Sequence, residues 1–377
     1  MSGARAAEAG GESRAGRAGR WLRPSVSWLL AFVPVTLALE HLGAAPPWVF
    51  FSAALSIVPI AAGIVRATEQ LAHRTGDAVG GLLNATFGNA PELIIAVVAL
   101  RAGLFDMVRA SLVGAILANL LLALGGAFLL GGLRHHEQEF NPAATRLYGT
   151  MMLLATTSLI VPSAFSRFLA GEALALPEIQ LNTALSIALL VAYGLYLLFM
   201  LRTHPDLFRS AAGGEAEGEE GPRWSLLRAV ASLVVASVAA AWMSEILVGA
   251  AEGTGQALGM SQAFIGLVFL AIVGGAAESG SAIAMARKGK MDLSVGIALG
   301  SCIQIALFVA PLLVLASRLV APRPFTLAFS RAELGTTFLA VLVGAMVAGD
   351  GKSNWYKGVL LVTFYAIVAM LFYFAPA

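Results

Sequence analysis

Charge is scarce in this 377-residue chain. Only 12% of its residues are Asp, Glu, Lys or Arg, which is about half the share found in ordinary soluble domains. Hydrophobic residues make up 58%, and the mean hydropathy is +0.82. This composition excludes a soluble globular protein and predicts that a lipid bilayer is the solvent. The formal net charge of +2 excludes the strongly basic character of a nucleic-acid-binding protein.

Cysteine is almost absent as well. The single cysteine, Cys302, excludes an internal disulfide and a metal site built from several thiolates. The chain also lacks an HExxH zinc motif and a Gly-x-Gly-Asp aspartyl motif, since Val347 occupies the first glycine position of the latter. An intramembrane hydrolase is therefore only a remote alternative, and we predict a protein that is not an enzyme and needs no cofactor.

What the chain does contain is a series of apolar stretches of about 20 residues, long enough to cross a bilayer. They predict an all-α polytopic membrane protein with about eleven transmembrane helices. The stretches are 25–45, 48–66, 79–100, 107–130, 147–168, 179–201, 225–250, 260–286, 292–316, 333–349 and 355–374. The first resembles a signal peptide, but its length, Pro34 and Glu40 favour an uncleaved helix.

The positive charges predict an orientation. With the N-terminus in the cytoplasm, about three quarters of the 24 Lys and Arg residues fall in cytoplasmic loops, as the positive-inside rule requires. The C-terminus is then expected outside. We predict an integral, multi-pass protein whose first partner is the lipid bilayer; no feature of the sequence indicates an oligomeric state.

One hydrophilic segment, 204–224, divides the chain, and its middle reads GGEAEGEEGP. Its glutamates form either a solvated cytoplasmic connector or a Ca²⁺-sensing lid. They are Glu215, Glu217, Glu219 and Glu220. The predicted organisation is a disordered tail at 1–24, an extra N-terminal helix at 25–45, a first repeat at 46–203, the acidic linker at 204–224 and a second repeat at 225–377.

The two parts of the chain contain a similar polar motif inside an apolar span. GLLNATFGNAPELIIA in the first part and IVGGAAESGSAIAM in the second each place glycines before a glutamate. Because the predicted orientation sends these two helices through the bilayer in opposite directions, the repeats have inverted topology. A second polar-dotted helix follows each one, with Ser111, Gly114 and Asn119 in the first part and Gly296, Gly300, Ser301 and Gln304 in the second.

Glu92 and Glu278 are the candidate ion-binding and proton-coupling residues. A charge in the middle of a span costs about 3 kcal/mol or more, so each is expected to face the protein interior or an aqueous cavity. The expected supporting ligands offer oxygen atoms or an interrupted backbone. They are Gly88, Asn89, Asn119, Gly274, Gly275, Ser301 and Gln304. Asn119 and Gln304 either bind the ion or form hydrogen bonds between helices, and a lone buried glutamate would be equally consistent with a structural role.

Two converging carboxylates would repel each other, and one divalent cation or two protons would neutralise them. Hard oxygen ligands without a thiolate or an intramembrane histidine favour Ca²⁺. We therefore predict an antiporter that exchanges Ca²⁺ for H⁺ by alternating access. The same architecture carrying Mn²⁺, or using Na⁺ as the counter-ion, remains the nearest alternative, and a scaffold or receptor would not require matched buried acids.

At these residues the sequence resembles the calcium/proton (cation/proton) exchangers of the Ca²⁺/cation antiporter superfamily. GGLLNATFGNAPELIIA and SLVGAILANLLLALG are similar to the family's first repeat, and IVGGAAESGSAIAMARKGKMDLSVGIALGSCIQIALFVAP to its second. The resemblance implies a sodium/calcium exchanger-like fold of eleven helices, with inverted five-helix repeats after one extra helix. It implies ion binding by Glu92 and Glu278 with support from Asn89, Ser301 and Gln304. A bacterial inner membrane is the expected location.

Three positions depart from the family pattern. Gly275 stands where the family usually has asparagine, Ser279 where it has histidine, and Ala115 where serine is common. The loss of one amide ligand and one titratable group predicts a lowered but not abolished Ca²⁺ affinity.

Overall fold

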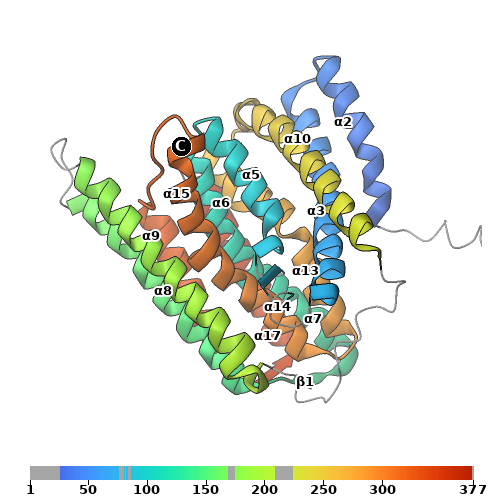
Figure 1. Ribbon diagram of the computed structural model, residues 1–377, viewed down its shortest axis with the longest axis vertical. Helices are drawn as coiled ribbons and strands as arrows, with labels where there is room; N and C mark the ends of the chain where they lie inside the picture. Colours follow the sequence, from blue (N-terminus) through green and yellow to red (C-terminus); the bar gives the residue numbers. More distant parts are fainter. Residues whose placement is uncertain are drawn as a thin grey trace, which may run out of the picture.

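The computed structural model describes residues 26–75, 80, 82–83, 86–168, 175–208 and 224–375, and these fold as a helical bundle (Figure 1). The tail at 1–24 and most of the linker at 204–224, with Glu215, Glu217, Glu219 and Glu220, lie outside the described residues.

The elements of the first part extend into the start of the linker. They are η1 (Val26–Ala31), α2 (Phe32–His41), α3 (Pro46–Thr75), α5 (Ala90–Arg101), α6 (Phe105–Leu117), η2 (Ala118–Ala123), α7 (Leu124–His135), β1 (Glu137–Glu139), α8 (Pro142–Phe168), α9 (Ala175–Leu198), η4 (Phe199–Thr203) and η5 (Pro205–Leu207).

The elements of the second part follow it. They are α10 (Leu226–Leu258), α11 (Gln262–Phe264), η6 (Ile265–Leu270), α12 (Ala271–Gly274), α13 (Ala276–Arg287), α14 (Met291–Gln304), η7 (Ile305–Val309), α15 (Ala310–Val320), α16 (Arg331–Ala348), β2 (Lys352–Asn354) and α17 (Trp355–Phe374).

Eight helical segments among the described residues are long and apolar enough to cross a membrane, and the bent pair Gln262–Gly274 and Ala276–Arg287 makes a ninth. The prediction of a helical, multi-pass membrane protein is thereby confirmed. Two predicted spans differ in form. The segment at 25–45 contains a short apolar helix, Val26–His41, and the segment at 79–100 is only partly described and ends in the twelve-residue α5.

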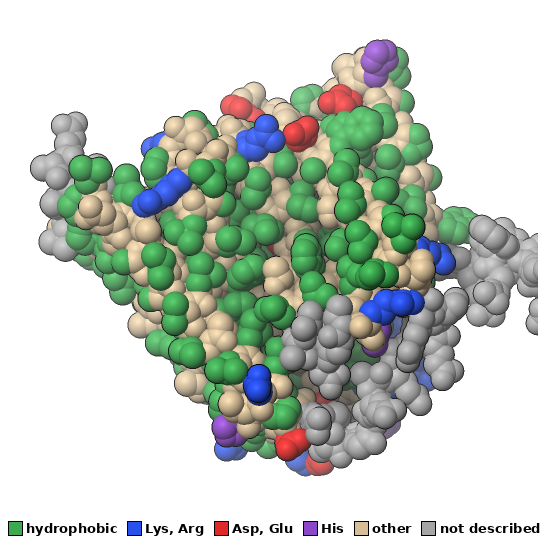
Figure 2. All heavy atoms as spheres, viewed as in Figure 1, with side chains coloured by type: hydrophobic (Ala, Val, Ile, Leu, Met, Phe, Trp, Pro, Cys, Tyr) green, Lys and Arg blue, Asp and Glu red, His purple; other side chains and the backbone are tan. Residues whose placement is uncertain are grey.

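The surface agrees with a bilayer as solvent. Figure 2 shows hydrophobic side chains over the middle of one face, with most charged side chains near its upper and lower edges. Large apolar side chains are exposed on the long helices, such as Val235 and Trp242 on α10 and Leu195 on α9. In water this exposure would be costly, whereas in lipid it costs nothing.

The bundle has a centre and two flanks. α10 packs along α3, with α2 beside it, on one flank, and α8 and α9 lie on the other (Figure 1). Between them are α5, α6 and α7 from the first part and α12 to α15 from the second, so that α6 crosses η6, and α13 packs against both α7 and α14.

Glycines allow the closest of these crossings. A Cβ on Gly114 would lie 2.1 Å from the carbonyl oxygen of Leu267, and one on Gly266 would lie 2.4 Å from that of Met107. The backbones of α6 and η6 are therefore in direct contact, which is the packing that small residues provide in membranes.

A two-stranded antiparallel sheet, absent from the sequence prediction, joins two loops at one end of the bundle. Gln138 of β1 pairs with Ser353 of β2, and the Gln138 amide donates a hydrogen bond to the carbonyl oxygen of Ala286. Glu137 and Glu139 both form ion pairs with Lys352, at 2.8 and 3.2 Å. These ion pairs join the side chains of the two strands.

Candidate functional site

Both candidate glutamates lie where a helix begins inside the bundle. Asn89 precedes α5 and Gly275 precedes α13, and each glutamate is the third residue of its helix. The chain bends by 57° at Gly275, and a turn at residues 88–89 precedes α5. The predicted helix interruptions are confirmed. Each carboxylate sits in the first turn of a helix, where the helix dipole favours negative charge.

The first glutamate packs directly against the second helix break. A Cβ on Gly274 would lie 3.0 Å from Cγ of Glu92, and one on Gly275 would lie 3.6 Å from its Oε1. The same point on Gly275 is 3.8 Å from Nδ2 of Asn119. Glu92, both glycines and Asn119 therefore meet at one place, although they come from α5, from η2 and from the junction of α12 and α13.

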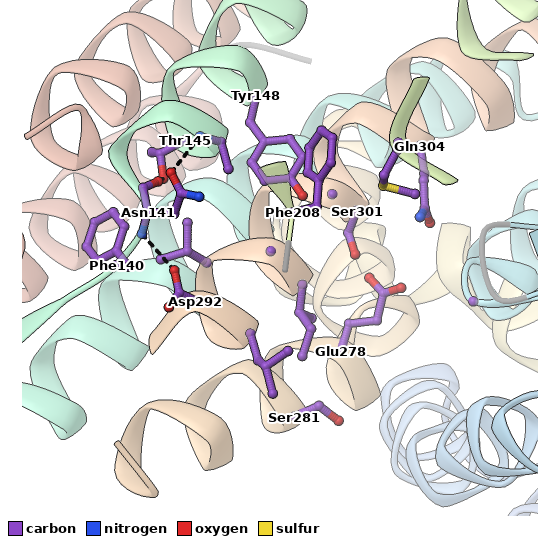
Figure 3. A pocket seen from close by; sticks show the side chains of 18 of the residues that line it. Phe140, Asn141, Thr145, Tyr148, Phe208, Glu278, Ser281, Asp292, Ser301 and Gln304 are labelled. Atoms are coloured by element: carbon purple, nitrogen blue, oxygen red, sulfur yellow. Dashed lines mark hydrogen bonds between the residues drawn. The ribbon is translucent and has the colours of Figure 1, made fainter. Parts of the chain in front are cut away.

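The helix break before α5 is joined to the end of α14 by a hydrogen bond. Nδ2 of Asn89 donates a hydrogen bond to Oε1 of Gln304, and Asn89 is fully buried. The Ser301 hydroxyl lies beside the Glu278 carboxylate, and Figure 3 shows these two side chains pointing toward one another.

The two glutamates come close to one another at the second helix break, because Oε1 of Glu92 is 3.6 Å from the Cβ position of Gly275, three residues before Glu278. Together with Gly88, which lines the same cavity as Glu278, Ser301 and Gln304, the structure brings all nine candidate residues to one region. No Lys or Arg among the described residues forms an ion pair with either glutamate. In the described part of the chain, the two carboxylates therefore have no protein counter-charge.

Several buried polar atoms of this region have no hydrogen-bond partner among the described residues. They are Oδ1 of Asn89, both carboxylate oxygens of Glu92, both amide atoms of Asn119 and Oε2 of Glu278. Buried polar atoms are almost always paired in folded proteins, so a cluster of unpaired ones indicates a site for an ion or for water. Five of these six atoms are oxygens, the ligands that hard cations prefer.

Three π-helical segments surround the site, and sequence reasoning missed them. Asn119 lies on η2, Gln304 immediately precedes η7, and η6 leads into the helix break at Gly275. A π-helical turn shifts the following side chains around the helix, and such turns are frequent at functional sites. No residue type marks them in advance, because their hydrogen bonding depends on the tertiary packing.

A cavity of about 340 Å³ leads to Glu278 from the end of the molecule that carries β1 (Figure 3). Its inner wall includes Glu278, Ser301 and Gln304, and its outer part includes Asn141 and Asp292. The backbone N–H of Asn141 donates to Oδ1 of Asp292 at 2.7 Å, which joins the start of α8 to the start of α14.

Sequence reasoning did not find the other cavity residues. Ser281 lies three residues after Glu278, so it shares a face of α13. That spacing was the available signal. Tyr148, Tyr196 and Phe208 form an aromatic cluster on the cavity wall, and nothing in their local sequence separates them from ordinary core aromatics.

A second cavity, of only about 10 Å³, adjoins Glu92 on the side away from β1. Ser111, Ala115, Leu270 and Val309 are among its lining residues. The volume corresponds to about one water molecule. In this structure the site is therefore open toward the β1 end and nearly closed toward the other.

The chain is similar to known proteins over most of its length. The family model described as sodium/calcium exchanger protein matches residues 45–202 and 228–374. A Ca²⁺/H⁺ antiporter of Synechocystis sp. is 40% identical over 363 residues, covering 92% of this chain and 96% of that protein. The Ca²⁺/H⁺ antiporter ChaA of Bacillus subtilis is 40% identical over 320 residues, covering 85% of this chain and 90% of that protein.

A solved structure, that of native YfkE, superposes with a TM-score of 0.80 at 36% identity, covering 93% of this chain and all of that one. The family match lies on both sides of the linker and includes all nine residues brought together at the site, but not the glutamates of the linker. The resemblance to the Ca²⁺/cation antiporters stated from the motifs is confirmed, and the chain belongs to the sodium/calcium exchanger family, whose members are transporters rather than enzymes.

Proposed function

We propose that this chain exchanges Ca²⁺ for H⁺ across a membrane, with Glu92 and Glu278 as the shared site for both ions. The observation that carries the proposal is the meeting of these two buried carboxylates, with three oxygens unpaired among the described residues and no basic partner. The similarity to Ca²⁺/H⁺ antiporters at 40% identity supports the choice of ions.

Charge repulsion explains why occupancy by the two ions would be mutually exclusive. Two unit charges about 5 Å apart at an effective dielectric of about 20 repel by roughly 3 kcal/mol, before desolvation is counted. One Ca²⁺ or two protons would remove this repulsion. The empty, doubly charged site would be too unstable to move between the two sides of the membrane, so transport in one direction would require transport in the other.

The remaining ligands would complete the coordination of Ca²⁺, which takes six to eight oxygens. Oδ1 of Asn89 and the Ser301 hydroxyl would supply side-chain oxygens, and Asn119 would supply one directly or through a water molecule. Gln304 would act through Asn89, whose amide it orients. Gly88, Gly274 and Gly275 would let the backbone approach the ion.

We further propose eleven spans arranged as one extra helix and two inverted five-helix repeats, with boundaries as expected from the sequence. The matching positions of Glu92 and Glu278, each third in a helix that starts inside the bundle, support this arrangement. If the chain lies in a bacterial inner membrane with its N-terminus on the cytoplasmic side, the β1 end also faces the cytoplasm. The cavity would then present Glu278 to cytoplasmic ions.

The test is ⁴⁵Ca²⁺ uptake into proteoliposomes under an imposed pH gradient. We expect uptake by the native chain and its loss in both Glu92→Gln and Glu278→Gln, because either amide removes the charge balance of the pair. Glu245→Gln is the matched control: Glu245 is also a helical glutamate, but its side chain is 59% exposed and pairs with Arg101 at 3.9 Å. Its uptake should equal that of the native chain.

Two results would overturn the proposal. If well-folded native protein moves no Ca²⁺, the ion is a different one, and Mn²⁺ uptake and Na⁺-driven exchange are measured next. If Ca²⁺ moves but the glutamine variants transport normally, the site lies elsewhere.

A stoichiometry of two protons per Ca²⁺ also predicts that clamping the membrane potential at different values leaves the uptake rate unchanged, since the exchange moves no net charge.

A further inference from the structure

The two halves of the site are unequal. Glu278 has the Ser301 hydroxyl beside it, and Asn89 donates a hydrogen bond to Gln304. Glu92 has no hydrogen-bond partner on another described residue for either carboxylate oxygen. Asn119, beside it, has none for either amide atom, although its side chain is only 1% exposed.

Corresponding positions explain the difference. Gly275 precedes Glu278 by three residues, as Asn89 precedes Glu92, so the second half lacks the amide that the first half has. Ala115 follows Gly114 as Ser301 follows Gly300, so the half around Glu92 also lacks a hydroxyl. Both missing groups would face Glu92: Ala115 lines its small cavity, and the Cβ position of Gly275 is 3.6 Å from its Oε1.

The fold does not require glycine at position 275. Its φ of −80° and ψ of 7° are open to any residue. A Cβ there would meet its nearest neighbour, the carbonyl oxygen of Ala271, at 3.3 Å, a contact relieved by a shift of a few tenths of an ångström. Gly274 differs, because its Cβ would press against Glu92 at 3.0 Å. The absence of a side chain at 275 therefore matters for what binds beside Glu92.

We propose that Gly275 and Ala115 leave room for a water molecule in the half of the site around Glu92, which we call the hydrated half. The transported cation keeps this water, which bridges it to Glu92 and Asn119. This inference rests on the exchange activity proposed above and concerns its selectivity. The unpaired carboxylate and amide atoms supply the two or more polar partners that such a water needs.

Hydration of one half predicts a broad choice of divalent cations. Mg²⁺ and Mn²⁺ are smaller than Ca²⁺, and Mg²⁺ in particular loses its waters reluctantly. A site that strips every water selects for Ca²⁺, whereas a site that accepts a retained water loses much of that preference. We therefore expect Mn²⁺ and Mg²⁺ to compete with Ca²⁺ at the native site.

The experiment measures ⁴⁵Ca²⁺ uptake in proteoliposomes at increasing Mn²⁺ or Mg²⁺, for the native chain and for Gly275→Asn and Gly275→Ala. The asparagine supplies a protein oxygen in place of the water, so the ratio of half-inhibitory Mn²⁺ to half-saturating Ca²⁺ should rise by roughly five- to tenfold, the range that one added polar contact provides. The alanine adds volume without a ligand and should lower the affinity for all three ions without raising the ratio.

The outcomes separate this inference from the proposed function. Absence of gradient-driven Ca²⁺ uptake in the native chain would overturn the proposed exchange itself. Normal native uptake with an unchanged ratio in Gly275→Asn would overturn the hydrated half alone. If Gly275→Asn does not fold, Ala115→Ser tests the same half from its other wall, and an unchanged ratio there would likewise contradict the inference.

Discussion

The two sides of the glutamate pair differ in the space that they leave beside the carboxylates. Toward the β1 end lies a cavity of about 340 Å³, and the glycines of α14 on its wall, Gly296 and Gly300, have no atom within 4 Å of a built Cβ. Toward the opposite end lies a cavity of about 10 Å³. There Gly114 and Gly266 hold α6 and η6 in backbone contact.

The difference shows that glycine serves two opposite purposes in one bundle. On the open side it leaves space beside the charges, and on the closed side it removes the side chains that would keep helices apart. A transporter with one fixed site needs an open and a closed side at any moment. Among the described residues, the large cavity reaches Glu278 from the β1 end, and the proposed exchange would take this arrangement as its one-sided state.

Cysteine labelling tests this comparison most directly. In a Cys302→Ala background, Ser281→Cys places a thiol in the large cavity and Ser111→Cys places one at the small cavity. A membrane-impermeant, positively charged methanethiosulfonate should modify Ser281→Cys on the order of 100-fold faster, because thiol reactivity follows access to water. The rate is measured in vesicles of each orientation, and modification from the β1 side is expected.

Cys302→Ala is itself the control, since the thiol it removes is 1% exposed and donates only a long 3.4 Å hydrogen bond to Ile116. Equal rates for the two engineered thiols would contradict a one-sided state. Modification of Ser281→Cys from the cytoplasmic face would also support the proposed orientation, whereas modification from the other face would reverse it.

A pair of glycine substitutions tests the closed side. Gly114→Ala forces a methyl group against the Leu267 carbonyl, so α6 and η6 must separate, and the free energy of unfolding should fall by about 1–3 kcal/mol. Gly296→Ala is the matched control on the open side of the site. It meets no atom, and alanine is the better helix former, so stability should stay equal or rise. Both are measured by unfolding titrations of the purified protein in mixed micelles.

Most of the spans, and the broken helices that carry the two glutamates, were predictable because their signals are local. A charge within twenty apolar residues stands out wherever the chain folds, and glycine or proline beside it marks a broken helix. The pairings were not predictable. Asn89 and Gln304 are 215 residues apart, and no pattern along one helix tells which face of another helix it meets.

The same limit applies to the cavity and the sheet. Tyr148 and Phe208 resemble ordinary core aromatics until the fold brings them to one wall. The strands of the β1–β2 pair have only three residues each, too few for an alternating pattern to show. Selection of Asn119 as a candidate came from its polarity alone; its unpaired amide in contact with the second helix break is visible only in the structure.

The smallest expected effect concerns a surface ion pair at the β1 end of the bundle, on the side of the large cavity. Asp350, in the turn between α16 and β2, forms an ion pair with Lys357 at 2.7 Å. Burial raises the pKa of Asp350, but hydrogen bonds from the Lys357 side chain and the Lys352 backbone lower it by more, so its pKa lies below the usual value. The pair therefore stabilises the fold above about pH 4, and this contribution is lost as the pH falls through the lowered pKa.

Because the Asp350 side chain is 55% exposed, Asp350→Asn should cost less than about 1 kcal/mol at pH 7, and the cost should shrink below about pH 4. Lys357 also donates to the carbonyl oxygens of Val347 and Lys352, so a double-mutant cycle with Lys357→Met isolates the ion pair. A coupling free energy of the same size at pH 7 and below pH 4 would show that the Asp350–Lys357 ion pair does not stabilise the β1 end of the bundle. The open side would then be stabilised by packing, as the closed side is, and the two sides would differ only in their cavities.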